Sequence, residues 1–202
     1  MELILVRHGQ TDSNVGLRYC GQTDIGLNEA GGRQAADVAE RLFGRLGGRF
    51  DSIHSSPLSR AYDTAKAIAV RFGVAESDIV KADALLEGHF GVFEDLTYKE
   101  IMNNFPNEYK MWREDWEGYV IEGGESSKMV SDRVGAFFWE FLERNSGGTH
   151  LFVFHMGSMS FAMSSLLGLD IKSAWRFKID NTGIVTIRVN REKYCYLTAL
   201  NV

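Results

Sequence analysis

The chain has 202 residues, of which 45% are hydrophobic and 24% charged. This length suits one domain, and the composition is typical of a globular protein, which excludes a disordered chain. The 22 basic and 27 acidic residues give a net charge of −5, so the overall positive field of a nucleic-acid or anionic-lipid binder is absent. We therefore expect neither nucleic acid nor membrane as a partner.

The cysteines and the N-terminal residues indicate a cytoplasmic location. Cys20 and Cys195 have neither a metal-site spacing nor the density of a disulfide scaffold. The apolar run after Met1 lacks the basic leader and cleavage site of a signal peptide. Residues 145–169 contain no Asp, Glu, Lys or Arg. Their histidines, hydroxyl residues and Gly–Gly pair nevertheless predict a strand and then a helix, not a transmembrane span.

Hydrophobic periodicity predicts strands alternating with helices. The run Leu3–Val6 is typical of a strand buried on both faces. Apolar residues at helical spacing predict a helix that ends near Gly47–Gly48, and Ser56 with Pro57 predicts the start of another. In chain order we expect a strand over 3–6, a helix over 29–46, a strand over 50–55, a helix over 57–72, a strand at 79–80, a helix over 125–144, a strand over 150–154, a helix over 157–167, and strands over 183–189 and 194–200.

This alternation predicts an α/β fold. We expect a three-layer α/β/α sandwich with a mostly parallel central sheet, formed by residues 1–202 as a single domain. Residues 87–125 interrupt the alternation and are expected to be a lid-like insertion covering one edge of the sheet, with short helices around 98–104 and 108–116. The insertion carries ten acidic and three basic residues.

Charged residues follow three of the predicted strands. The first strand leads into Arg7 and His8, the second precedes Arg60, and the strand ending at residue 154 leads into His155. Ligands of doubly wound sheets bind beyond the carboxyl ends of the strands, so these side chains are expected to meet at one rim. Each alone is more often a surface charge or a structural histidine. Together they form a basic cluster suited to a phosphate dianion.

Further residues extend this cluster into a longer pattern. It comprises Arg7–Thr11, Asn14, Gly21–Leu27, Gly31, Ser55–Ala61, Thr64–Ala65, Leu86–Glu87, Phe90–Gly91, Glu94, His155 and Gly157. In order and spacing, over nearly the whole chain, the pattern resembles the histidine phosphatase superfamily. The resemblance implies a phosphoglycerate mutase-like fold and a phosphatase that hydrolyses a small-molecule phosphate ester.

The resemblance also implies a role for each residue of the cluster. His8 would attack phosphorus as a neutral imidazole and form a phosphohistidine. Glu87 would protonate the leaving alkoxide and then deprotonate the attacking water. Neither a metal nor another cofactor is implied, and the sequence contains no cysteine-based phosphatase loop and no helical histidine pair for zinc. The phosphate oxygens would be held by Arg7, Asn14, Arg60 and His155.

A finer resemblance concerns the substrate. The stretches Tyr109, Trp112, Asp115–Trp116 and Gly123–Ser126 look most similar to α-ribazole phosphatases, which act in cobalamin nucleotide-loop assembly. The alternatives are a broad-specificity sugar or nucleotide phosphatase, a phosphoglycerate mutase and a non-catalytic binder of phosphorylated partners. The acidic insertion disfavours the mutase, whose substrate carries a second anionic group.

Aromatic residues of the insertion have two possible uses. They could stack against an aromatic or sugar group of the substrate, or they could simply pack the insertion onto the domain. These residues are Phe90, Phe93, Tyr109, Trp112, Trp116 and Tyr119.

Four residues depart from the family pattern. Phe93 stands where tryptophan is usual and Asp95 where glycine is usual, which leaves the local shape beside Glu87 open. Phe154 replaces a small hydroxyl residue, and Met156 is also atypical. We expect these last two to narrow the pocket or to change how the neighbouring histidine is oriented.

Overall fold

The computed structural model describes residues 1–48 and 50–202 and contains a six-stranded sheet in the order β3-β2-β4-β1-β5-β6. The first four strands in this order are parallel to one another, whereas β5 is antiparallel to both of its neighbours. The predicted, mostly parallel sheet is therefore confirmed. The strands are β1 (Glu2–Arg7), β2 (Ser52–Ser55), β3 (Ile79–Lys81), β4 (Thr149–Phe154), β5 (Ile184–Val189) and β6 (Cys195–Leu200).

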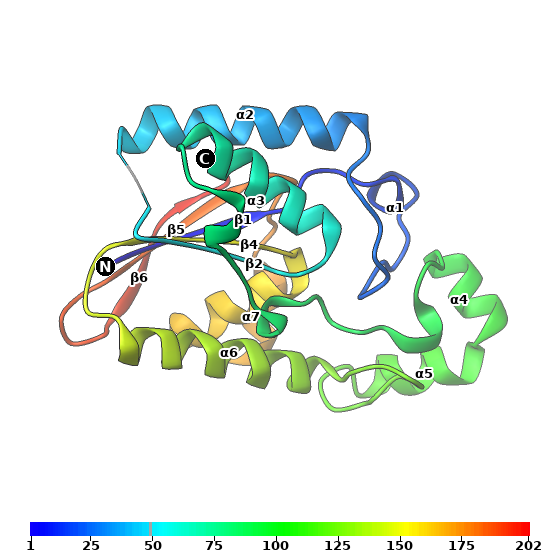
Figure 1. Ribbon diagram of the computed structural model, residues 1–202. Coiled ribbons are helices and arrows are strands. Elements are labelled where there is room, and N and C mark those ends of the chain that lie inside the picture. The colour runs from blue at the N-terminus through cyan, green and yellow to red at the C-terminus, as the bar shows by residue number, and fades with distance from the viewer. Residues whose placement is uncertain (49) are drawn as a thin grey trace.

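Helices cover both faces of the sheet, because the side chains of a strand alternate between its faces. Leu3 and Leu5 pack with α6 (Ser127–Arg144) and α7 (Met156–Leu166), below the sheet in Figure 1. Ile4 and Val6 pack with α2 (Glu29–Leu46) and α3 (Ser59–Arg71), above it. Each of these four side chains is at most 1% exposed, and such burial contributes about 2 kcal/mol per side chain. The predicted three-layer sandwich is confirmed.

Local signals explain how α2 begins and ends. Asn28 accepts a hydrogen bond from the backbone N–H of Gly31 (2.8 Å) and caps the N-terminus. Gly47 adopts a left-handed conformation (φ 56°) and ends the helix, as the glycine pair predicts.

The start of α3 differs from the prediction. The helix begins at Ser59, two residues after Pro57, and Leu58 is still extended. The first helical N–H donates to Asp24 Oδ1 (2.7 Å), which lies in a distant loop. A capping group 35 residues away leaves no local pattern, so the sequence placed the boundary at the serine and proline.

Residues 87–125 form a group of short helices at the carboxyl ends of the parallel strands (Figure 1). Phe93, Ile101 and Ile121 make a small hydrophobic cluster within it. The predicted helix at 108–116 begins two residues earlier, because proline suits the first helical position. The elements of this segment are η3 (Gly91–Phe93), α4 (Tyr98–Asn104) and α5 (Pro106–Glu114).

Several short elements were not predicted. They span three to six residues, which is too short for hydrophobic periodicity to reveal. They are α1 (Asp12–Val15), η1 (Glu76–Asp78), η2 (Asp83–Leu85) and η4 (Ile171–Arg176).

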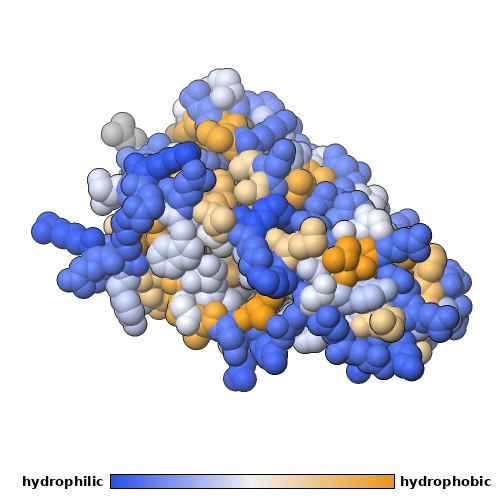
Figure 2. All heavy atoms as spheres, turned by 90° about the horizontal axis from the view of Figure 1, so that it is seen from below, coloured by the Kyte–Doolittle hydropathy of each residue, from blue (hydrophilic) through white to orange (hydrophobic). Residues whose placement is uncertain are grey.

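The charge-free stretch 145–169 divides into β4 and α7, as predicted. Among the described residues, no helix combines the length and the hydrophobicity needed to cross a membrane. Figure 2 shows the molecule from below, where hydrophilic side chains predominate and hydrophobic ones occur in separate small groups.

Candidate active site

The parallel strands bring the predicted residues to one rim. Arg7, the last residue of β1, pairs with Phe154, the last residue of β4. His8 and His155 therefore follow at the same level, and their ring centroids lie 5.1 Å apart. Arg60, in the first turn of α3, is 1% exposed. A guanidinium buried so completely beside two histidines marks a polar site rather than a surface charge.

A cavity of about 650 Å³ opens at this rim. His155 is fully buried beside His8, beneath the cavity surface. The other five predicted site residues line the cavity, and they are Arg7, His8, Asn14, Arg60 and Glu87.

His8 is held in one tautomer. Its Nδ1 lies 2.7 Å from the carbonyl oxygen of Gly9. A carbonyl only accepts, so Nδ1 carries the proton and Nε2 keeps its lone pair. Burial lowers the pKa of His8 well below its ordinary value, and the charges of Arg60 and Arg7 lower it further. The ring is therefore neutral at pH 7, the form in which an imidazole is a nucleophile.

His155 is also neutral and is oriented by a serine. Its Nε2 lies 2.8 Å from Ser56 Oγ. Burial is the main cause that lowers the pKa of His155 well below its ordinary value, and Arg60, His8 and Arg7 add to it. Ser56, predicted as a helix cap, contacts this ring instead.

Two buried side-chain nitrogens beside His8 have no hydrogen-bond partner among the described residues. Within residues 1–48 and 50–202, Arg7 Nε and His155 Nδ1 are buried without a hydrogen bond. Burial lowers the pKa of Arg7, and Glu87 and Asp180 act in the opposite direction. Unsatisfied buried polar atoms are costly and rare in folded proteins, so these two nitrogens are candidates for binding the oxygens of a ligand in the cavity.

A loop from the N-terminal part of the chain orients Arg60. The guanidinium donates to the carbonyl oxygens of Gly21 (2.6 Å) and Thr23 (2.9 Å). Glu94 holds this loop by accepting from the backbone N–H groups of Gln22 (2.8 Å) and Thr23 (2.7 Å). Gly21 has a left-handed φ of 53°, and a Cβ at this position would collide with Glu94.

Glu87 binds the N-terminus of α7. Its Oε2 accepts from the backbone N–H of Gly157 (3.0 Å), and its Oε1 accepts from that of Ser158 (2.8 Å). The carboxylate therefore satisfies two of the orphan N–H groups of the helix and lies at the positive end of its dipole. A Cβ on Gly157 would approach Glu87 Oε1 to 2.7 Å, so glycine is needed for this contact.

Asn14 presents its amide group to the cavity. Its Oδ1 accepts from the backbone N–H of Thr11 (3.0 Å), in a capping box on α1, and from Asn181 Nδ2 (3.2 Å). Because the oxygen is engaged twice, the NH₂ group is the part that remains for an anion. Asn181 also donates to the carbonyl oxygen of His8 (3.1 Å), a link that the sequence did not predict.

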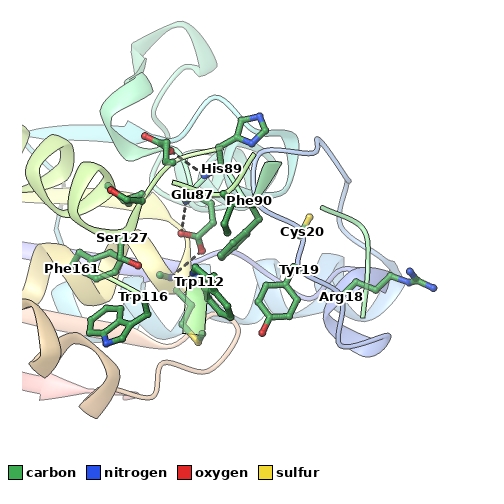
Figure 3. Close-up of a pocket in the computed structure, with 18 of the residues that line it drawn as sticks. Arg18, Tyr19, Cys20, Glu87, His89, Phe90, Trp112, Trp116, Ser127 and Phe161 are labelled. Carbon is green, nitrogen blue, oxygen red and sulfur yellow. Dashed lines mark hydrogen bonds between the residues drawn. The ribbon is translucent and has the colours of Figure 1, made fainter. Parts of the chain in front are cut away.

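Aromatic side chains form much of the cavity wall. Figure 3 shows Tyr19, Phe90, Trp112 and Trp116 around Glu87. Phe161 and Trp175 complete the wall from α7 and η4.

The aromatic residues of the insertion divide between the cavity wall and the hydrophobic cluster of the insertion, and stacking on a substrate stays a prediction. Phe90, Trp112 and Trp116 line the cavity, whereas Phe93, Tyr109 and Tyr119 pack in the hydrophobic cluster of residues 87–125.

The four unusual residues have clear structural settings. Asp95 adopts the left-handed conformation that glycine favours (φ 57°), which aspartate tolerates better than most residues. Phe93 is fully buried beside Trp112. Phe154 points into the core against α6, so it does not narrow the cavity as expected. Met156 does line the cavity, and its sulfur lies 3.9 Å from Arg7 Nη1.

The described part of the chain contains no cluster of three or more His, Cys, Asp or Glu side chains that could hold a metal ion.

Comparison with known proteins identifies the family. The model of the histidine phosphatase superfamily (branch 1) matches residues 3–202. Phosphoserine phosphatase 1 of Hydrogenobacter thermophilus is 32% identical over 96% of this chain and 89% of its own length. The chain belongs to the histidine phosphatase superfamily. It is a phosphatase, as the resemblance implied.

Two solved structures illustrate the range of similar enzymes. The α-ribazole phosphatase of Shigella flexneri has a TM-score of 0.91 and 29% identity, covering 100% of this chain and 96% of that one. Mycobacterial glucosyl-3-phosphoglycerate phosphatase has a TM-score of 0.85 and 31% identity, covering 100% and 98%. The similar proteins thus agree on the reaction class and differ in the substrate named.

Proposed function

We propose that the chain is a phosphomonoesterase that forms a phosphohistidine on His8, and that its substrate is α-ribazole 5′-phosphate. The observation that carries the chemistry is the fixed tautomer of His8. With Nδ1 bound to Gly9, the lone pair of Nε2 is available at the cavity, and the neutral ring needs no base to activate it.

In the first step of the proposed reaction, His8 Nε2 attacks phosphorus and the bond from phosphorus to the leaving oxygen breaks. Glu87 gives the leaving oxygen the proton that it takes from water in the second step of the preceding turnover. In the second step a water attacks phosphorus, Glu87 takes the water's proton, and the P–N bond breaks. His8 and Glu87 then return to their starting states, and inorganic phosphate is released.

Four side chains are proposed to hold the phosphoryl oxygens. Arg7 and Arg60 supply positive charge, and Asn14 and His155 supply neutral donors. Phosphoryl transfer depends largely on positioning and on charge stabilisation of this kind. The unsatisfied Arg7 Nε and His155 Nδ1 support this assignment, because a bound phosphate would give them acceptors.

The aromatic wall supports a substrate with a flat, largely apolar group. A nucleotide-like monophosphate such as α-ribazole 5′-phosphate could stack its base against Trp112, Trp116 or Tyr19. Arg18, also on the wall, is paired with Glu100 (3.2 Å), which partly offsets its positive charge. The proposal places the reaction in cobalamin nucleotide-loop assembly in the cytoplasm.

A substrate panel tests the proposal. We expect phosphate release from α-ribazole 5′-phosphate with a kcat/KM at least about tenfold above those for phosphoserine, glucosyl-3-phosphoglycerate and simple sugar phosphates, a ratio worth about 1.4 kcal/mol. Activity is expected to persist in a chelator. Preference for another ester would refute the substrate alone, whereas isomerisation without phosphate release would indicate a mutase.

A rapid-quench trap tests the intermediate. Substrate labelled in its phosphate should leave an acid-labile, base-stable label on the wild type and none on His8→Ala. His54→Phe is the matched control, because His54 packs against Phe141 and Phe152 and does not line the cavity. Equal labelling of His8→Ala would refute the proposed nucleophile.

A further inference from the structure

One ion pair beside the cavity contacts the chain on both sides of Glu87. Arg133 in α6 binds Glu125 through two hydrogen bonds, from Nη2 to Oε2 (3.0 Å) and from Nε to Oε1 (3.2 Å). The side chains are 24% and 18% exposed, respectively. Two-bond pairs of this kind fix the plane of the guanidinium, so its remaining N–H groups point in defined directions.

The remaining N–H groups of Arg133 bind the backbone that leads to Glu87. Nη1 donates to the carbonyl oxygens of Ala84 (3.0 Å) and Leu86 (3.1 Å). Nη2 lies 3.5 Å from the carbonyl oxygen of Glu87 itself. One rigid group therefore anchors three carbonyls within four residues, which fixes this backbone to α6.

Glu125 anchors the residues that follow Glu87. Its Oε2 accepts from the backbone N–H of His89 (3.0 Å) and from Gln22 Nε2 (3.1 Å). The Gln22 amide also lies 3.1 Å from the carbonyl oxygen of Glu87. The ion pair thus fixes the chain on both sides of one residue and connects it to the loop that orients Arg60.

We propose that Arg133 and Glu125 position the carboxyl group of Glu87 for protonation of the leaving group. This inference rests on the proposed function, in which Glu87 is the acid. Glu87 must reach the leaving oxygen while it also contacts the N-terminus of α7. A misplacement of about 1 Å at a reacting group can cost as much as a hundredfold in rate.

The leaving group separates this role from a purely structural one. An alkoxide leaves only with a proton, whereas p-nitrophenolate is stable enough to leave without one. Loss of a positioning residue should therefore slow an alkyl phosphate far more than p-nitrophenyl phosphate. A general loss of structure should slow both alike.

The experiment measures kcat/KM for β-glycerol phosphate and for p-nitrophenyl phosphate. This parameter is used because kcat/KM depends only on the steps up to and including phosphoryl transfer. For Arg133→Met we expect a loss of about tenfold or more with the alkyl ester, against less than about threefold with the aryl ester. The inhibition constant of inorganic phosphate should change less than about twofold. Glu125→Gln, which keeps the size of the side chain, should show the same selectivity more weakly.

Two reference variants make the outcome decisive. Arg144→Met removes an exposed ion pair with Glu140 from the same helix and should leave both substrates unaffected. Glu87→Gln should itself be selective against the alkyl ester, and equal losses there would refute the proposed acid. If Glu87→Gln is selective but the Arg133 and Glu125 variants slow both esters equally, only the positioning role is refuted. If circular dichroism shows that Arg133→Met does not fold, the selectivity of Glu125→Gln between the two esters tests the positioning role instead.

Discussion

Replacing Ser56 by alanine tests how far one hydroxyl controls the site. Ser56 Oγ lies 2.8 Å from His155 Nε2, and it also accepts a longer contact from the backbone N–H of Leu58 (3.4 Å). If His155 Nδ1 carries the proton that meets the phosphate, Nε2 must accept from the serine hydroxyl. Alanine removes that donor without adding bulk.

The expected magnitude follows from burial. The imidazole of His155 and the side chain of Ser56 are both fully buried, so water cannot replace the missing hydroxyl. A buried acceptor left without its donor costs about 1–3 kcal/mol of stability. The ring also loses the contact that selects its tautomer. We expect kcat/KM to fall by about tenfold, which corresponds to about 1.4 kcal/mol of transition-state stabilisation.

Ser55→Ala is the matched control, because Ser55 is equally buried and its Oγ donates to a backbone carbonyl, that of Ser56 (2.8 Å). It should lose about 1 kcal/mol in urea unfolding and keep kcat/KM within about twofold. Nitrogen NMR of the histidine ring should show Nδ1 protonated in the wild type and a tautomer mixture in Ser56→Ala. An unchanged tautomer and unchanged kcat/KM in Ser56→Ala would show that the hydroxyl of Ser56 does not select the tautomer of His155.

Three further predictions concern other positions. Gly157→Ala should displace Glu87, whose Oε1 would lie 2.7 Å from the new Cβ, and should lower kcat/KM for alkyl phosphates by about tenfold while p-nitrophenyl phosphate is spared. Gly32→Ala in α2 meets open space and should raise the free energy of unfolding by about 0.5–1 kcal/mol in urea titrations. Burial and the neighbouring His150 lower the pKa of His54 to about 4. In the unfolded chain this histidine has its ordinary pKa of about 6.5, so it takes up a proton at a higher pH there than in the folded protein. The free energy of unfolding therefore falls as the pH drops from 6.5 towards 4. This histidine should account for about 2–3 kcal/mol between pH 7.5 and pH 4.5. His54→Phe should flatten the pH dependence of the free energy of unfolding by that amount, and an unchanged pH dependence would contradict the lowered pKa of His54.

The hydrophobic pattern of the sequence predicted the fold, because each layer of the sandwich requires apolar residues on the faces that it buries. The run Leu3–Val6 is apolar throughout since both faces of β1 are covered, and α2 shows its buried stripe together with the glycine that ends it. The same reasoning placed the start of α3 two residues early, because the group that satisfies the first N–H is Asp24. Boundaries fixed by tertiary contacts leave no periodic signal.

The site residues also divide into those that a local pattern predicted and those that depend on contacts between distant segments. The strand-end rule was enough to bring Arg7, His8 and His155 together, because parallel strands end at one rim. Glu87 came from family resemblance alone, since its position depends on the N-terminus of a helix 70 residues later. The supporting contacts of Ser56 and Asn181 were missed, because each joins segments that are far apart in the chain.

The charges of the site explain why two histidines and two arginines belong together. Burial lowers the pKa values of His8 and His155, and Arg60 and Arg7 lower them further, so the two arginines hold the formal charge while the two rings stay neutral. A phosphomonoester dianion brings two negative charges to those two positive ones, which limits the net charge that must be buried. A third cation in place of His8 would bind the anion more tightly but would have no lone pair to attack it. The field that attracts the substrate is therefore also the field that keeps the proposed nucleophile reactive.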